Sequence, residues 1–429
     1  MGRRGRKAAA IAAVSEPTAA REALERRWRD RLSVEPRLAL DKSRGLAATG
    51  RGASAICQGL ATLVTAEGAR REAFHRWLPY KQGFSPGLVR LFLAENPRTP
   101  KHWASHPVLD PFAGTGTCAV ECARHGVRAI GVDAIPALVF LANAKFGREF
   151  PPLPDTSGAS MWQEVADRLC LPIHRAALML AVGRQHTTAG RANRGARPLG
   201  VVLDEVVMMM HDDLSHPLAS ANRIEVGDAR RLTTIDDGAI GGILTSPPYL
   251  SRHDYTRIAD PYETVYRYWY AGQVCHCCVS SGVSNTNHTA HRAVAHGGVE
   301  QVRASLRGRG EGDPSSTVAA AEEAAEWLSK IGQAKLATIV QGYVEDMTQV
   351  LRECHRVLAP GGPCWMVVGG ARIKDVYVPS DLIVAELAGR CGFRVEAIRV
   401  ARDLVGSPRK FGRLGHVAPR ESLLVMSRG

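Results

Sequence analysis

The chain has 429 residues, of which 45% are hydrophobic, 23% charged and only 6% aromatic. This length and composition suffice for two or three globular units and exclude a fibrous or disordered protein. Lys and Arg number 55 against 42 Asp and Glu, and the net charge of +13 favours a polyanionic partner. No apolar run reaches the roughly 18 residues of a membrane span, which excludes a membrane protein.

The ten cysteines are scattered along the chain, several inside apolar stretches such as 117–120, whereas a disulfide framework would be short and dense. The sequence therefore predicts a cytoplasmic protein. Arg-rich residues 3–7 precede an Ala-rich stretch and faintly imitate a targeting peptide, but the apolar segment is weak and Glu16 and Pro17 follow closely.

Residues 1–52 hold 13 Lys and Arg against 6 Asp and Glu and few large apolar side chains. This bias predicts a flexible basic arm with one helix around 21–32. Such an arm binds phosphates or keeps the protein in solution.

Short apolar runs alternate with helical patterns from residue 105 onward. The predicted strands begin at 108–109 and continue with 127–132, 223–226, 242–245, 364–368, 393–401 and 421–426. The predicted helices between them are 117–125, 136–145, 334–358 and 380–391. This alternation predicts an α/β fold, a doubly wound, seven-stranded, mostly parallel sheet.

Two long segments interrupt this core, which is predicted to comprise 80–146, 223–270 and 334–429. The insertion at 147–222 carries helical material and four arginines with no acid between them: Arg184, Arg191, Arg194 and Arg197. The insertion at 271–333 is rich in Gly, Ser, Cys and His. Long interruptions in compact domains are usually functional or disordered, so both are candidates for target recognition.

A cofactor loop follows the first predicted strand, with the sequence Asp110-Pro111-Phe112-Ala113-Gly114-Thr115-Gly116. Its two glycines let the backbone approach a ligand closely, and the next helix presents free amide groups. Asp133 ends the following strand, 17 residues beyond Gly116, where a carboxylate can take both hydroxyls of a ribose. A nucleoside-containing cofactor is implied.

The same glycines, with Ala119, also satisfy the dinucleotide fingerprint, so an NAD-dependent oxidoreductase stays a rival. A glycine turn that serves only tight strand-to-helix packing would look the same.

A second loop, Ser246-Pro247-Pro248-Tyr249, follows the predicted strand 242–245. Two consecutive prolines remove backbone donors and leave carbonyl acceptors in a rigid extended chain. The exocyclic amino group of a nucleobase is a donor, so Ser246 and the Pro247 carbonyl could draw its nitrogen towards a tetrahedral, nucleophilic form. Tyr249 offers an aromatic face for an extruded base. A Ser-Pro-Pro-Tyr sequence is an ordinary turn in most proteins. Here it follows a strand that comes after a cofactor loop, and this position favours a catalytic role.

These paired motifs resemble the S-adenosylmethionine-dependent amino-methyltransferases of DNA, over residues 80–146, 223–270 and 340–428. The resemblance implies S-adenosyl-L-methionine as cofactor and double-stranded DNA as partner. It assigns cofactor contacts to Phe84 and Ser85 at the methionine end, to Asp110, Phe112, Gly114 and Gly116 in the loop, to Asp133 on the ribose, and to Asp228 on the adenine side. It assigns catalysis to Ser246, Pro247, Pro248 and Tyr249.

Members of this family with Ser in the first catalytic position usually modify the 4-amino group of cytosine, and those with Asp or Asn the 6-amino group of adenine. The resemblance therefore implies a cytosine-N4 enzyme, associated with the nucleoid and paired with a cognate restriction endonuclease. An adenine-N6 enzyme, an RNA amino-methyltransferase and a non-catalytic DNA-binding module remain open. A cytosine carbon-5 enzyme would need a Pro-Cys nucleophile that this loop lacks.

A Cys and His cluster, Cys275-His276-Cys277-Cys278 with His288, His291 and His296, is the remaining motif. Structural zinc sites usually show two pairs of ligands at regular spacing, and this spacing is irregular. The sequence predicts a polar recognition loop and no metal.

Overall fold

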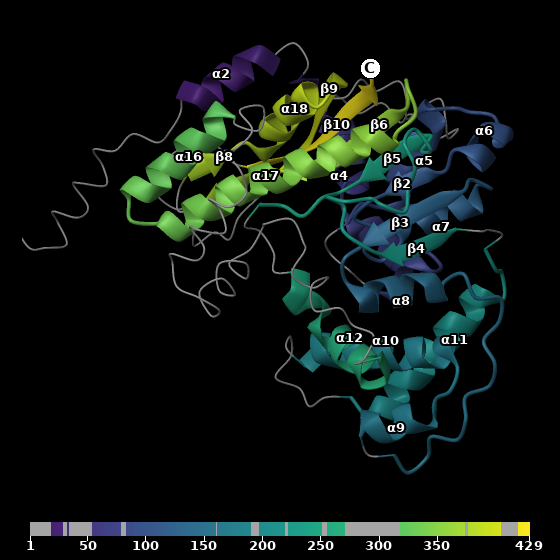
Figure 1. Ribbon diagram of the computed structural model, residues 1–429. Helices are drawn as coiled ribbons and strands as arrows, with labels where there is room; N and C mark the ends of the chain where they lie inside the picture. Colours follow the sequence, from purple (N-terminus) through teal and green to yellow (C-terminus); the bar gives the residue numbers. More distant parts are fainter. Residues whose placement is uncertain are drawn as a thin grey trace, which may run out of the picture.

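A computed structural model of the protein describes residues 19–28, 32–33, 54–78, 83–159, 161–189, 197–218, 222–250, 255–270, 318–373, 376–404 and 419–429. Its centre is a sheet in the order β1-β9-β10-β6-β5-β2-β3-β4 (Figure 1). These strands are β1 (Leu32–Ser33), β2 (Val108–Asp110), β3 (Ala129–Asp133), β4 (Arg223–Val226), β5 (Gly242–Thr245), β6 (Pro363–Gly369), β9 (Phe393–Asp403) and β10 (Arg420–Arg428). A separate antiparallel pair is formed by β7 (Ala371–Ile373) and β8 (Val376–Val378).

All seven predicted strands are present, and the predicted doubly wound, mostly parallel fold is confirmed. Strand β10 is antiparallel to both of its neighbours, β6 and β9, while the other pairings of this sheet are parallel. The two-residue edge strand β1, the pair β7–β8 and the antiparallel course of β10 are additions to the sequence prediction. An apolar run marks a strand, but it does not give the strand's direction.

Helices cover both faces of the sheet (Figure 1). They are α2 (Ala19–Trp28), α4 (Ser54–Leu63), α5 (Pro86–Glu95), α6 (Pro100–Ser105), α7 (Thr117–Arg124), α8 (Pro136–Ala144), α16 (Ala319–Lys330), α17 (Ala334–Val357) and α18 (Ser380–Arg390). Side chains alternate between the faces because a strand has a period of two residues. Leu109 and Ile243 pack with α17 and α18, while Val108 and Leu244 pack with α4, α5 and α7.

The helix predicted around 21–32 is present as α2, and this described part of the N-terminal arm is packed against the core. Helix α2 contacts α16 and α18, and Leu24 and Trp28 are buried. These two residues stand four apart and so share one helix face. Arg27 Nη1 also donates to Glu386 Oε1 at 3.0 Å. The arginines at 3–6 lie outside the described residues.

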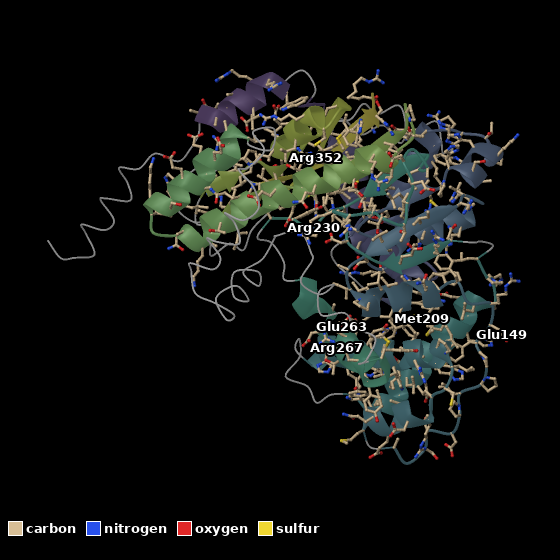
Figure 2. The ribbon with its side chains drawn as sticks, viewed as in Figure 1. Glu149, Met209, Arg230, Glu263, Arg267 and Arg352 are labelled. Atoms are coloured by element: carbon tan, nitrogen blue, oxygen red, sulfur yellow. The ribbon has the colours of Figure 1, made fainter. Side chains whose placement is uncertain are left out.

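The insertion at 147–222 is helical, with α9 (Trp162–Arg168), α10 (Pro172–Ala189) and α11 (Leu199–Leu214). These helices form a cluster beside α8, together with α12 (Tyr255–Tyr270), which follows the second loop (Figure 1). Glu263 of α12, shown in Figure 2, is 5% exposed and accepts a hydrogen bond from the Ala137 amide at 2.9 Å. Helix α12, predicted as part of the core, thus joins the insertion to the start of α8.

Two of the four arginines in this insertion are engaged within the protein. Arg184 donates to the backbone carbonyls of Arg76 and Trp77, at 3.1 and 3.3 Å, and Arg197 donates to Glu205. Arg191 and Arg194 lie outside the described residues. Within the ranges that the structure describes, no helix combines the length and apolar character that a bilayer crossing requires.

Candidate active site

The cofactor loop and the second loop meet at the point where the strand order reverses. The chain runs from β2 outward through β3 and β4, then returns to place β5 on the other side of β2. Open α/β sheets bind ligands at such a switch point, beyond the carboxyl ends of the strands. Asp110 ends β2 and Thr245 ends β5, so both loops leave the sheet at this position.

Thr245 joins the two loops directly. Its Oγ1 donates a hydrogen bond to Asp110 Oδ1 at 2.7 Å, and the Phe112 amide donates to the same oxygen at 3.1 Å. Asp110 is 3% exposed, and burial raises its pKa to about 7 although both hydrogen bonds favour the charged form. A carboxyl group that titrates near neutral pH therefore lies at the base of the site.

A pocket at this position brings together five of the residues predicted from the sequence. They are Phe84, Asp110, Phe112, Gly114 and Ser246. The segment that precedes α5 completes the pocket wall with η2 (Ala66–Arg71) and η3 (His75–Trp77), contributing Ala69, His75 and Leu78. Ser246 is partly exposed there. Ser85 is buried at the N-terminus of α5 and lies outside this lining, and its amide donates to Leu63 O at 2.8 Å.

The two glycines of the cofactor loop have different surroundings. Both have a positive φ, 50° at Gly114 and 79° at Gly116. A Cβ placed at Gly116 would lie 2.8 Å from Ile224 Cδ1 and 3.1 Å from Ala142 Cβ, whereas at Gly114 the nearest atom would be Phe112 O at 3.9 Å. Gly116 thus serves the packing of α7 onto α8 and β4. Gly114 lines the pocket, and the space that its side chain would fill is open.

Asp133 holds the cofactor loop from the next strand. Its Oδ2 accepts from the Gly114 amide at 2.7 Å and its Oδ1 from the Ile135 amide at 2.9 Å. Burial raises its pKa, and these amide hydrogen bonds counter that effect. Each carboxylate oxygen has a second lone pair, so a ribose contact stays a prediction compatible with this geometry.

Asp228 is paired with an arginine. Arg230 donates to it from Nη2 at 2.7 Å and also donates from Nη1 to Asp346 of α17 at 2.8 Å; Figure 2 shows Arg230 beside that helix. The loop after β4 is thereby tied to α17. The predicted adenine contact of Asp228 would have to share the carboxylate with this ion pair.

Tyr249 is held in the protein interior. It is 8% exposed, its hydroxyl donates to Glu421 Oε1 at 2.6 Å, and a Cβ at Gly369 would lie 2.5 Å from its Cδ2. Glu421 also accepts from Arg402 Nε. Gly369 and Glu421 belong to β6 and β10, so the tyrosine anchors the end of the second loop to the antiparallel half of the sheet.

Lys145 is a site residue that the sequence did not indicate. It is 2% exposed and its Nζ donates to the Thr115 carbonyl of the cofactor loop at 2.6 Å. Burial lowers its pKa to about 7. A lysine at the end of a predicted helix is usually exposed to solvent. The fold brings Lys145 to the cofactor loop, 30 residues away in the sequence.

Metal ligands do not cluster in the part of the chain that the structure describes: it contains no group of three His, Cys, Asp or Glu that could hold an ion. Cys275, the rest of that cluster and its downstream histidines lie outside these residues. The prediction that the cluster holds no metal stays a prediction.

No protein-family model matches the chain. Among curated proteins it is similar to the type II methyltransferase M.BsoBI of Geobacillus stearothermophilus, with 19% identity over 85% of this chain and 87% of that protein. It is likewise similar to the type II methyltransferase M.AvaI of Nostoc, with 22% identity over 85% and 88%. A third, M.MjaII of Methanocaldococcus jannaschii, is 34% identical over 20% of this chain and 15% of its own length.

Solved structures also align with the chain. A SAM-dependent methyltransferase of Methanosarcina mazei covers 78% of it at 10% identity, with a TM-score of 0.31 and 96% of that chain matched. Geranyl diphosphate methyltransferase covers 96% at 10% identity, with a TM-score of 0.32 and 99% of that chain matched. These TM-scores are too low to bear on function. The curated relatives agree with the predicted class, and over 85% of its length the chain is similar to type II methyltransferases.

Proposed function

We propose that this protein transfers a methyl group from S-adenosyl-L-methionine to the exocyclic 4-amino group of cytosine in duplex DNA. One observation carries the proposal: Ser246 of the second loop lines the same pocket as Asp110 and Gly114 of the cofactor loop, at the switch point of the sheet. Methyl transfer needs its two reactants at one place, because the reacting atoms must come within about 3–3.5 Å in line.

The pocket residues fit the proposed cofactor. Gly114 leaves space where a side chain would otherwise stand, so the backbone can approach a ligand. The Asp110 carboxylate offers a negative charge to a sulfonium cation. Asp133, which lies outside the pocket lining and holds the Gly114 amide, offers acceptors to ribose hydroxyls. When bound, S-adenosyl-L-methionine supplies an electrophilic methyl group on sulfur.

Ser246 and Pro247 act on the base in this proposal. The Ser246 hydroxyl and the Pro247 carbonyl accept hydrogen bonds from the amino group and orient its lone pair towards the methyl carbon. The N–C bond forms as the S–C bond breaks, leaving S-adenosylhomocysteine, and the amino nitrogen then releases a proton to water. Pro248 keeps the loop extended, and the reaction requires no metal and no covalent enzyme intermediate.

Tyr249 has two proposed roles, one for its hydroxyl group and one for its ring. The hydrogen bond to Glu421 supports an anchoring role for the hydroxyl. Stacking on an extruded base is a role of the ring, and the small exposed fraction of Tyr249 means that the loop must shift to offer it.

Double-stranded DNA is the proposed partner. The net charge of +13 supports a polyanion, and the type II methyltransferases similar to this chain support DNA among polyanions. Recognition of the DNA target sequence is assigned to the two insertions, 147–222 and 271–333. A cognate restriction endonuclease is proposed as second partner on the strength of the same relatives.

Transfer of tritium from methyl-labelled cofactor to duplex DNA and to structured RNA tests the proposal. Label in DNA that falls roughly 10²–10³-fold with Ser246→Ala, at unchanged cofactor affinity, is the expected result. The matched control is Ser105→Ala, because Ser105 is an exposed serine on α6. Label in RNA alone, or equal transfer by the Ser246 variant, would contradict the proposal.

A further inference from the structure

His75 lines the pocket and plays no part in the function proposed above. It is 4% exposed and lines the pocket with Asp110, Gly114 and Ser246. The preceding residue, Phe74, has a φ of 62°, the one positive value outside glycine in the described chain. Backbone strain of this kind persists where the surrounding structure imposes it, and it often marks functional positions.

Asp213 of α11 fixes this strained turn. Its Oδ2 accepts from the Phe74 amide at 2.6 Å and from Trp77 Nε1 at 2.7 Å, and its Oδ1 accepts from Arg76 Nε at 3.1 Å. Asp213 is 2% exposed. The insertion at 147–222 therefore places the imidazole, although none of its described residues lines the pocket.

Glu121 of α7 fixes the proton on the His75 ring. Its Oε1 lies 3.0 Å from His75 Nε2, and it also receives Arg90 Nε at 2.8 Å and Arg124 Nη1 at 2.8 Å. Burial alone would raise the pKa of Glu121, but the hydrogen bonds from His75 and Arg90 bring it down to about 2. An ionised carboxylate only accepts hydrogen bonds, so Nε2 carries the proton.

His75 Nδ1 is then a lone-pair acceptor. Burial lowers the pKa of His75 to about 4, which keeps the ring neutral at physiological pH. Nδ1 is buried and has no hydrogen-bond partner among the residues that the structure describes. A buried acceptor without a partner costs free energy, and in a pocket wall it indicates a donor that arrives with the ligand.

We propose that His75 Nδ1 binds the cofactor by accepting a hydrogen bond from its α-ammonium group. This inference rests on the proposed function, since it names the part of S-adenosyl-L-methionine that this wall recognises. The cofactor has three kinds of N–H or O–H donor: the adenine amino group, the ribose hydroxyls and the ammonium. Asp133 and Asp228, assigned to the nucleoside, are absent from the pocket lining, whereas His75 lines the pocket together with Gly83 and Phe84 of the predicted methionine end.

The charges near His75 are consistent with a cationic donor. Glu121 and Glu72 are the acids of this cluster, Arg90 and Arg124 pair with them, and the buried Lys145 has its pKa lowered to about 7. The two carboxylates and the two guanidinium groups balance in formal charge. A neutral imidazole acceptor therefore binds a cation without a positive charge on its own ring.

Two variants separate the ring nitrogens. Asn at position 75 puts an amide oxygen near the place of Nδ1, while Gln reaches towards Glu121 with its amide nitrogen and leaves the Nδ1 position empty. Binding is measured by calorimetry with S-adenosylhomocysteine, with decarboxylated S-adenosylmethionine, which keeps the ammonium, and with 5′-methylthioadenosine, which lacks it.

We expect His75→Gln to weaken the first two ligands about 10–100-fold and to leave 5′-methylthioadenosine within about twofold, while His75→Asn restores most of the loss. Retained binding of 5′-methylthioadenosine also shows that each variant is folded. Equal weakening of all three ligands, or no weakening, would overturn the assignment of His75 alone. Wild-type protein that binds none of them would overturn the proposed function together with this inference.

Discussion

Thr245 Oγ1 donates a hydrogen bond to Asp110 Oδ1 at 2.7 Å, and this contact joins the ends of two neighbouring parallel strands. Asp110 opens the cofactor loop, and Thr245 precedes Ser246 in the second loop. The two loops are 135 residues apart in the sequence. Their relative position, on which an in-line transfer would depend, is therefore set by a buried side-chain hydrogen bond in addition to the sheet itself.

Removal of this hydrogen bond should affect both stability and the pH profile. Thr245→Val keeps the shape of the side chain but leaves Asp110 without its hydroxyl donor, which should lower the free energy of unfolding by about 1–3 kcal/mol. The pKa of Asp110 should rise further, because the lost hydrogen bond favours the charged form. Urea unfolding and the pH dependence of cofactor affinity measure the two effects. Thr245→Ser, which keeps the hydroxyl, should resemble the wild type, and a Val variant that matches it in both assays would contradict this role.

Cofactor affinity should depend on pH through Asp110. Its pKa in the ligand-free protein is about 7, against an ordinary value of 3.8, so the protonated form stabilises the fold below pH 4 and this contribution disappears as the pH rises through 7. A sulfonium cation in the pocket favours the ionised form. The affinity for S-adenosyl-L-methionine should therefore increase between pH 6 and 8, by at most about tenfold per unit below pH 7. Calorimetry should show a smaller increase for S-adenosylhomocysteine, which has no sulfonium charge, and Asp110→Asn should abolish the difference.

Alanine at the two glycines of the cofactor loop should affect different properties: Gly116→Ala mainly stability, and Gly114→Ala mainly cofactor affinity. Both positions have a positive φ, which costs an alanine about 1–2 kcal/mol in either place, so the backbone strain is matched. Gly116→Ala adds a collision with Ile224 and Ala142 and should unfold at the lower temperature. Gly114→Ala places its methyl group beside the pocket and should lose more cofactor affinity relative to its loss of stability. Equal effects of the two variants on both quantities would contradict the separate roles.

Two replacements of Tyr249 distinguish the anchoring role of its hydroxyl from the stacking role of its ring. Tyr249→Phe keeps the ring and removes the donor to Glu421, so it should lower the free energy of unfolding by about 1–3 kcal/mol while transfer stays near the wild-type rate. Tyr249→Ala should additionally weaken capture of the extruded base by about 1–3 kcal/mol. Duplexes with an abasic site at the target position provide the control, because they present no base to stack. If Phe slows transfer as much as Ala does, the hydroxyl carries the function.

The sequence predicted the strands and the two loops well because these features are local. Each strand is a short apolar run bounded by turn residues, as at 242–245 before Ser246 and at 108–109 before Asp110. The edge strand β1 has two residues, too few for a pattern, and Pro261 inside α12 obscures that helix.

The surroundings of the site residues could not be predicted in the same way. His75 meets Glu121 from 46 residues away, and the amide of Phe74 meets Asp213 from 139 residues away, so neither pair leaves a signal in a short window. Tyr249 illustrates the same limit. Its aromatic ring predicts a face for stacking an extruded base, which stays a prediction. The contact with Gly369 and the hydrogen bond to Glu421 depend on strands that follow Tyr249 by more than a hundred residues.

The identity of the methylated base tests the central claim most directly. Duplex DNA of mixed sequence is incubated with the protein and S-adenosyl-L-methionine, digested to nucleosides and analysed by mass spectrometry against synthetic standards. The proposed function predicts N4-methyldeoxycytidine as the product, and this nucleoside should be absent at short reaction times when Ser246→Ala replaces the wild type. N6-methyldeoxyadenosine as the sole product would contradict the cytosine assignment, and DNA without any methylated nucleoside would contradict the proposed function itself.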